Sequence, residues 1–204
     1  MFIKKVLMFL TTMLVAFSGL SYSNAYSATL PLSEDEKADL TFMREEEKLA
    51  RDTYLKLYDI WKLSVFSNIA SSEQMHMDAL LKLLKNYALP DPAAGNEIGE
   101  FTNDDLQTLY EQLIDAGDDS KINALKVGGL IEEKDMLDIK AAIERSQQQV
   151  IDKVYVSLLC GSRNHLRSFA QNIEVLTTQP YVAQILTQVE VDAIVDSPME
   201  KCSK

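Results

Sequence analysis

Residues 72–76 read Ser72-Glu73-Gln74-Met75-His76 and place a carboxylate three positions before one of only two histidines in the chain. They interrupt an apolar repeat that recurs at alternating intervals of three and four residues, the spacing of one face of an α-helix. The repeat consists of Phe66, Ile69, Glu73, His76, Leu80, Leu83 and Tyr87. Burying an ionised carboxylate without a partner is costly. This helix face therefore indicates either a buried polar network or a metal ion.

The composition is that of a folded, helical protein. The chain has 204 residues, of which 47% are hydrophobic and 25% are charged, enough for one well-buried domain. It has only seven glycines and five prolines, and no alternating strand pattern persists. We therefore expect an all-α fold.

The net charge of −11 bears on possible partners. It argues against nucleic acid, because phosphates are bound by basic patches. An acidic surface also suits the accumulation of cations, although most such charge is simply solvated.

The first 25 residues have the pattern of a secretory signal peptide. Lys4 and Lys5 precede an apolar run over 6–20, and small polar residues then lead to a cleavage site after Ala25. The run is short for a membrane span, which needs roughly 20 apolar residues. We expect a periplasmic or secreted protein without a stable membrane span after cleavage, and an uncleaved anchor is the alternative.

Cys160 and Cys202 are the two cysteines. In an exported chain they could form a disulfide that pins the C-terminal tail to a helix. Cys160, between Leu159 and Gly161, is equally explained as a small buried thiol. The sequence leaves both alternatives open.

The helices of the first half follow from caps and apolar stripes. Residues 26–32 form a flexible N-terminus, and Ser33 with Glu36 makes a capping box that opens the first helix. Its stripe consists of Leu40, Met43, Glu47, Ala50, Tyr54, Leu57 and Trp61. Glu45 and Glu46 fall off this stripe and are expected to face solvent. After a break at 62–64, a second helix runs over about 65–87 and ends before Pro90.

A long crossover over 90–121 follows, with its own short helix at about 103–114. The third helix is expected over 122–145, with the stripe Leu125, Gly128, Glu132, Asp135, Ile139 and Ala142. The fourth is expected over 148–176, with the stripe Ile151, Tyr155, Leu158, Ser162, His165, Phe169 and Asn172. The core domain thus spans 33–176, and a short C-terminal helix over 181–195 within the tail 177–204 packs outside it.

Polar stripe residues on four helices lie at matching heights. Glu47 precedes its hairpin turn by about as many residues as Glu73 and His76 follow it, and Glu132 and His165 are related in the same way. Two such hairpins would pack into a four-helix bundle with these groups in one layer. Carboxylates with imidazoles suit iron or manganese, and bridging carboxylates can hold two ions. Singly, each histidine is explained as a satisfied core residue and Glu132 as surface charge, but the matched heights favour a metal site.

These residues carry a resemblance to a known superfamily. The motif from Glu47 through Ala50-Arg51 to Tyr54, then Glu73-x-x-His76, Glu132 and His165, resembles the ferritin-like proteins, and its first helix resembles that of rubrerythrins. Segments 124–139 and 161–167 resemble a bacterial ferritin-like family catalogued as domain of unknown function 2202. The resemblance implies a four-helix bundle over about 33–176.

Ser162 departs from this pattern, because the superfamily places a carboxylate there. Asp135, one turn beyond Glu132, is a candidate replacement. The resemblance implies two iron or manganese ions held by Glu47, Glu73, His76, Glu132, Asp135 and His165. It also implies reaction with dioxygen or peroxide, with Tyr54 as a nearby hydrogen-bond or redox partner.

Other classes of function remain open from the sequence. The protein could bind or buffer metal without turnover, or it could be a metal-free helical interaction module. Storage of iron mineral is disfavoured, since nothing in the sequence signals a closed cage, although a homodimer is compatible with it. No cysteine cluster is present for a rubredoxin-type centre, so an enzyme of this kind would need an external electron donor.

Overall fold

The computed structural model describes residues 31–202 and confirms the all-helical class. Within that range there are six helices and no strand. They are α1 (Glu34–Trp61), α2 (Ser64–Asn86), α3 (Asp104–Asp118), α4 (Lys121–Arg145), α5 (Gln149–Thr177) and α6 (Gln188–Val195). The expected signal peptide lies outside the described residues. None of the helices described is long and apolar enough to cross a membrane.

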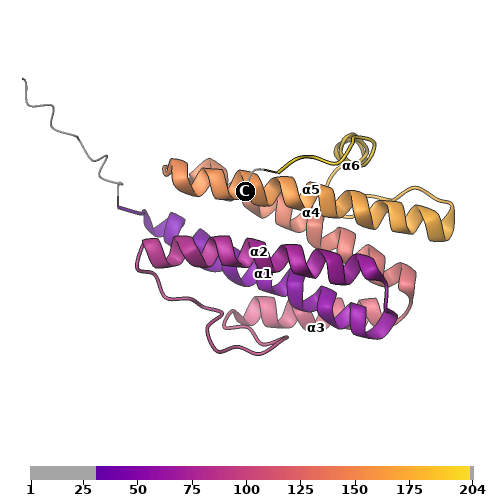
Figure 1. Cartoon of the computed structure of the whole chain (residues 1–204), viewed down its shortest axis with the longest axis horizontal. Helices are drawn as coiled ribbons and strands as arrows, with labels where there is room; N and C mark the ends of the chain where they lie inside the picture. Colours follow the sequence, from indigo (N-terminus) through magenta and orange to yellow (C-terminus); the bar gives the residue numbers. More distant parts are fainter. Residues whose placement is uncertain (1–30, 203–204) are drawn as a thin grey trace, which may run out of the picture.

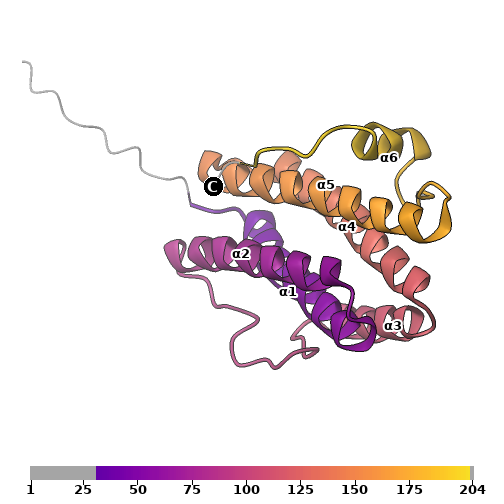
Figure 2. The same ribbon diagram turned by 45° about the vertical axis from the view of Figure 1, so that its right-hand side comes forward.

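Two long hairpins form the body of the molecule. The α1 and α2 helices pack along each other, as do α4 and α5, and the two pairs meet through α1 against α4 and α2 against α5 (Figures 1 and 2). The predicted capping box at Ser33 and Glu36 is present at the start of α1. Lys62, at the C-terminus of α1, adopts φ 55°, which turns the chain sharply into α2. The predicted hairpin turn is therefore found where the sequence placed it.

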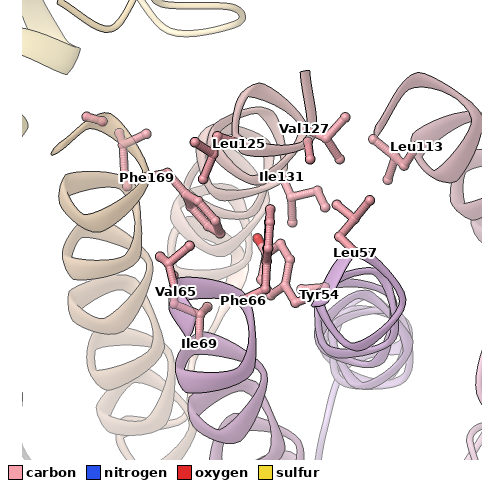
Figure 3. Close-up of a cluster of buried hydrophobic side chains, with 14 of the residues drawn as sticks. Tyr54, Leu57, Val65, Phe66, Ile69, Leu113, Leu125, Val127, Ile131 and Phe169 are labelled. Carbon is pink, nitrogen blue, oxygen red and sulfur yellow. The ribbon is translucent and has the colours of Figure 1, made fainter. Parts of the chain in front are cut away.

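The apolar core occupies the space between the hairpins on one side of the polar stripe positions. The rings of Tyr54, Phe66 and Phe169 meet there, with centroid separations of 5.2–6.2 Å (Figure 3). Gly128 is required at this point, because a Cβ on it would lie 2.4 Å from the Phe169 ring. A second core, with Leu40, Leu80, Ile139 and Tyr155 among its members, fills the other end. The polar layer is thus closed above and below by packed side chains.

The crossover from α2 to α4 is clamped onto α1 by buried charges. Lys48 Nζ lies 2.5 Å from the Asp52 carboxylate and donates to the carbonyls of Glu97 and Glu100. The expectation that Glu45 and Glu46 face solvent is wrong, since both are buried. Glu45 accepts from the backbone N–H groups of residues 102 and 103, just before α3. The crossover thus covers Glu45, Lys48 and Asp52, whereas Glu46 faces Lys134 on α4.

The C-terminal helix is shorter than predicted, and Glu133 explains why. The prediction placed a helix over 181–195, whereas α6 starts at Gln188 after a Thr187 N-cap. In the intervening segment the N–H groups of Gln184, Ile185 and Leu186 donate to the Glu133 carboxylate, not to helical carbonyls. Tyr181 also donates to it, at 2.7 Å. A fully buried carboxylate on α4 therefore holds this segment in a non-helical path.

The tail returns to α5 and is fixed there by a covalent bond. Cys160 and Cys202 form a disulfide with a Cα–Cα distance of 5.6 Å, which resolves the two alternatives left by the sequence. Glu200 reinforces the attachment through ion pairs with Arg163 and Arg167. The last described residues thus lie beside the middle of α5.

Candidate metal centre

The polar residues predicted from the sequence come together between the two hairpins. Glu47 comes from α1, Glu73 and His76 from α2, Glu132 from α4 and His165 from α5. Within residues 31–202 they form two groups that share Glu73, and each group has ligand atoms within 4.8 Å of one another. The groups are Glu47, Glu73 and His76, and Glu73, Glu132 and His165.

Glu73 occupies the centre of the arrangement. Its Oε2 lies 2.7 Å from His76 Nδ1, and its Oε1 lies 2.8 Å from His165 Nδ1. The two imidazole rings are stacked, with centroids 5.6 Å apart. Because one histidine belongs to each hairpin, the Glu73 carboxylate links the two halves of the molecule.

The outer carboxylates complete each group. Glu47 Oε2 lies 3.1 Å from His76 Nδ1, and Glu132 Oε2 lies 3.4 Å from His165 Nδ1. All three glutamates are at most 2% exposed. Each group therefore offers carboxylate oxygens and one imidazole nitrogen in a region shielded from water, a donor set that suits iron or manganese.

Two of these atoms have no hydrogen-bond partner although they are buried. Glu47 Oε1 is one, and His165 Nδ1 is another, despite its 2.8 Å approach to Glu73. The His165 nitrogen and the Glu73 oxygen are thus close without being aligned for a hydrogen bond, as when two ligand atoms face a common point. Buried polar atoms are rarely left unpaired in folded proteins. The residues present therefore fit a bound cation in each group.

Burial and mutual charge shift the acidities of the carboxylates. Burial raises the pKa of Glu47 well above its ordinary value. It raises the pKa of Glu132 to about 7 and that of Asp135 to about 6. Glu73 behaves oppositely, because the attraction of the two histidines outweighs burial and holds its pKa below the ordinary value. Without cations, protons must therefore neutralise part of this layer.

The pKa values of both histidines are raised. Burial opposes their protonation, but the carboxylates prevail and raise the pKa of His165 to about 10, with Glu73 the stronger influence. The pKa of His76 is also raised well above its usual range, by Glu47 and then Glu73. In the absence of metal, imidazolium groups supply the positive charge that this layer requires.

Neighbouring side chains hold the candidate ligands in position. Tyr54 donates to Glu132 Oε1 at 2.6 Å and so lies beside a candidate ligand. Ser72 Oγ lies 2.9 Å from His165 Nε2, the nitrogen that faces away from the carboxylates. Hydrogen bonds of this kind fix the orientation of ligating side chains. Ser72 was missed as a site residue, because its partner lies far away in the sequence.

Asp135 is buried nearby but belongs to neither group. Its Oδ2 accepts a hydrogen bond from Ser162 Oγ, and its Oδ1 is buried without a partner. Ser162 thus occupies the position expected to hold a carboxylate and binds Asp135. The candidate replacement ligand is accordingly engaged with the serine.

A surface groove of about 1010 Å³ between α2 and α5 leads to the histidines. Met75, Ala79 and Val156 form part of its apolar lining, and both His76 and His165 line it as well. Gly161 lets the His76 ring pack against α5, since a Cβ there would lie 2.5 Å from His76 Nε2. The histidines thus separate the carboxylate layer from a solvent-accessible groove.

The comparisons with known proteins agree with the sequence motifs. A family model described as an uncharacterized protein domain, DUF2202, matches residues 36–198. The chain belongs to this family. Every predicted ligand in this DUF2202 chain lies within the matched range.

One relative of this DUF2202 chain, the protein MJ0754, is similar both in sequence and in its solved structure. The uncharacterized protein MJ0754 of Methanocaldococcus jannaschii is 45% identical over 171 residues, 84% of this chain and 92% of the relative. The crystal structure of hypothetical protein MJ0754 matches with a TM-score of 0.81 and 45% identity, covering 83% of this chain and 97% of that one. This chain and MJ0754 therefore share a helical fold over nearly the whole length of MJ0754.

Proposed function

We propose that this protein is an exported, ferritin-like four-helix bundle whose polar layer holds two iron or manganese ions and reduces peroxide or reacts with dioxygen. The observation that carries the proposal is the placement of Glu73, whose two oxygens face histidines of different hairpins. One ion would be held by Glu47, Glu73 and His76, and the other by Glu73, Glu132 and His165. When bound, such ions supply Lewis acidity and electrons that side chains lack.

The chain's own residues would position the reactants. The groove between α2 and α5 admits a small oxidant to the histidine side of the layer. Tyr54 orients Glu132 and keeps a proton beside it, because burial raises the tyrosine pKa well above its ordinary value. The apolar cores on both sides exclude bulk water. The Cys160–Cys202 disulfide is consistent with export, since such bonds persist in oxidising compartments.

The first test is the metal content of the mature protein, with Glu73→Ala and His165→Ala as variants. We expect close to two ions per chain in the wild type, measured by plasma mass spectrometry after reconstitution. Glu73→Ala should lose both ions, because it removes the shared ligand. Asp78→Ala, an exposed carboxylate on the same helix, is the matched control and should retain both. Folded wild-type protein without bound metal would refute the proposal.

The second test concerns turnover. Protein loaded anaerobically with Fe(II) should oxidise it, on exposure to dioxygen or hydrogen peroxide, faster than the same buffer oxidises free Fe(II). An equal rate would refute the oxidoreductase part of the proposal while leaving metal binding intact.

Metal binding without turnover is the second candidate. Ser162 favours it, since the hydroxyl binds Asp135 where a further carboxylate ligand was expected. In that case the two ions would bind stoichiometrically, and Fe(II) would be oxidised no faster than in buffer. A metal-free interaction module would instead show unchanged or improved stability in Glu73→Ala, because a buried carboxylate without a cation is destabilising.

A further inference from the structure

The disulfide lies beside the candidate metal centre. Cys160 directly precedes Gly161, and a Cβ on Gly161 would lie 2.5 Å from Nε2 of His76. Cys202, brought back from the C-terminus, lines the groove that His76 and His165 also line. The two sulfurs are therefore close to the oxidant's route to the centre.

Asn164 holds the Cys202 sulfur in place at the groove. Asn164 Nδ2 lies 3.4 Å from Cys202 Sγ and is placed to donate to it. The amide is held by the backbone of Glu200, which accepts from Nδ2 at 3.1 Å and donates to Oδ1 at 2.9 Å. Asn164 also lines the groove. The Cys202 sulfur is therefore fixed in a partly exposed position at the groove, where an external thiolate can reach it for thiol–disulfide exchange.

We infer that Cys160 and Cys202 cycle between disulfide and dithiol and provide the two electrons for peroxide reduction at this centre, an inference that rests on the proposed function. In the dithiol form the two thiols lose two electrons and two protons as the S–S bond forms. Hydrogen peroxide takes up the same electrons and protons, its O–O bond breaks, and two molecules of water result. An external dithiol then restores the thiols by exchange and becomes a disulfide itself.

The stoichiometry supports this pairing. Reduction of one peroxide molecule needs two electrons, and one disulfide exchanges two electrons. The full sequence contains no cysteine besides these two, so a thiol couple within this chain must be this pair. The external electron donor expected from the sequence would then act on the groove-facing disulfide and need not reach the buried layer.

The first experiment uses the folded, metal-free protein and measures no catalysis. Dithiothreitol is added without denaturant, and free thiols are counted with a chromogenic disulfide reagent. We expect two thiols per chain while the circular dichroism stays native. A disulfide that is reduced only after unfolding would overturn the inference, since it could not take part in a cycle.

The second experiment follows the thiols during reaction. Reduced, metal-loaded protein receives one equivalent of hydrogen peroxide, and remaining thiols are trapped with N-ethylmaleimide and counted by mass spectrometry. We expect two thiols lost per peroxide, at least ~10-fold faster than in metal-free protein, because the reacting groups are held close together. Lys201→Ala, an exposed neighbour of Cys202, is the matched control and should react like the wild type.

The outcomes separate this inference from the proposed function. If metal-loaded wild type consumes peroxide with ascorbate as donor while its thiols remain reduced, the inference fails and the proposed function stands. The same conclusion follows if Cys160→Ser/Cys202→Ser, shown to be folded and metal-loaded, turns over peroxide with dithiothreitol as fast as the wild type. If metal-loaded protein consumes peroxide no faster than metal-free protein, both fail.

Discussion

Single residues determine how the polar layer is held, and Glu73 is the most connected of them. It faces both histidines, whereas Glu47 and Glu132 each approach one. The sequence could predict these positions, because each interrupts an apolar helical stripe. It could not predict the burial of Glu45 or Glu133, whose partners are backbone groups of distant loops. A helical stripe identifies what faces the core but not what a loop will cover.

Tyr54→Phe should weaken metal binding without unfolding the protein. The substitution removes the 2.6 Å hydrogen bond that orients Glu132. Loss of such an outer partner lowers metal affinity by roughly 10–100-fold. Competition with a fluorescent chelator would measure this, and Tyr58→Phe, half-buried on the same helix, is the control. Equal affinity in both variants would show that Tyr54 does not orient a ligand.

Gly161→Ala should affect the His76 half of the site selectively. The new Cβ would lie 2.5 Å from His76 Nε2, so the imidazole must leave its position beside Gly161 and its Nδ1 must move relative to Glu47 and Glu73. We expect loss of one of two ions, measured by elemental analysis of the folded variant. Ser168→Ala, on the same helix and bonded to the Asn164 carbonyl, should retain both. Full occupancy in Gly161→Ala would mean that the ring position is not critical.

At the scale of elements, the long helices were predictable within a residue or two. Ser33, Asn103 and Ser120 cap their helices with side-chain oxygens. Caps are local signals, so they can be recognised in the sequence. The start of α6 was not predictable, because Glu133 on α4 captures the backbone of a segment about fifty residues later. In this segment the hydrogen bonds to Glu133 override the local helix propensity.

Glu133→Ala should loosen the C-terminal segment while leaving the two hairpins intact. Four donors would lose their acceptor, and each buried unpaired donor costs about 1–3 kcal/mol. Hydrogen exchange should accelerate at the amides of Gln184, Ile185 and Leu186. Glu144→Ala, an exposed carboxylate on the same helix, is the control. Unchanged exchange at these amides would contradict the anchoring role.

At the scale of the whole molecule, the sequence did reveal that the candidate ligands of the two hairpins lie at matching heights. What it could not reveal was the groove between α2 and α5, because groove shape depends on how closely two helices approach. The sequence identified Ser162 as a departure from the expected carboxylate. Its hydrogen bond to Asp135 could be identified only from the three-dimensional structure. Side chains on different helices meet only once the helix axes are fixed.

The stability of the metal-free protein should fall as pH rises from about 5 to about 10. Glu132, with its pKa raised to about 7, and His165, with its pKa raised to about 10, bind protons more tightly when folded than when unfolded. Stability from these protons is therefore lost as pH rises through those values. Glu73, with a lowered pKa, contributes in the opposite sense only at more acidic pH.

Thermal unfolding at several pH values would measure this dependence. Manganese should raise the melting temperature more at alkaline than at acidic pH, because the ion and protons compete for the same oxygens and nitrogens. Glu132→Gln should flatten the metal-free profile between about 5 and 7, since the titrating group is removed. A metal-free melting temperature that rises over the whole range would contradict these pKa shifts.

The division into two hairpins also has a consequence for the order of folding. Contacts within each hairpin join residues close in sequence, so their loop-closure cost is small and each can form early. The two histidines reside on different hairpins, and their shared partner Glu73 meets His165 only when the halves dock. Docking then removes the carboxylates of both hairpins from water, and protons or a cation must offset this desolvation. A divalent cation present during refolding should accelerate that final step in particular.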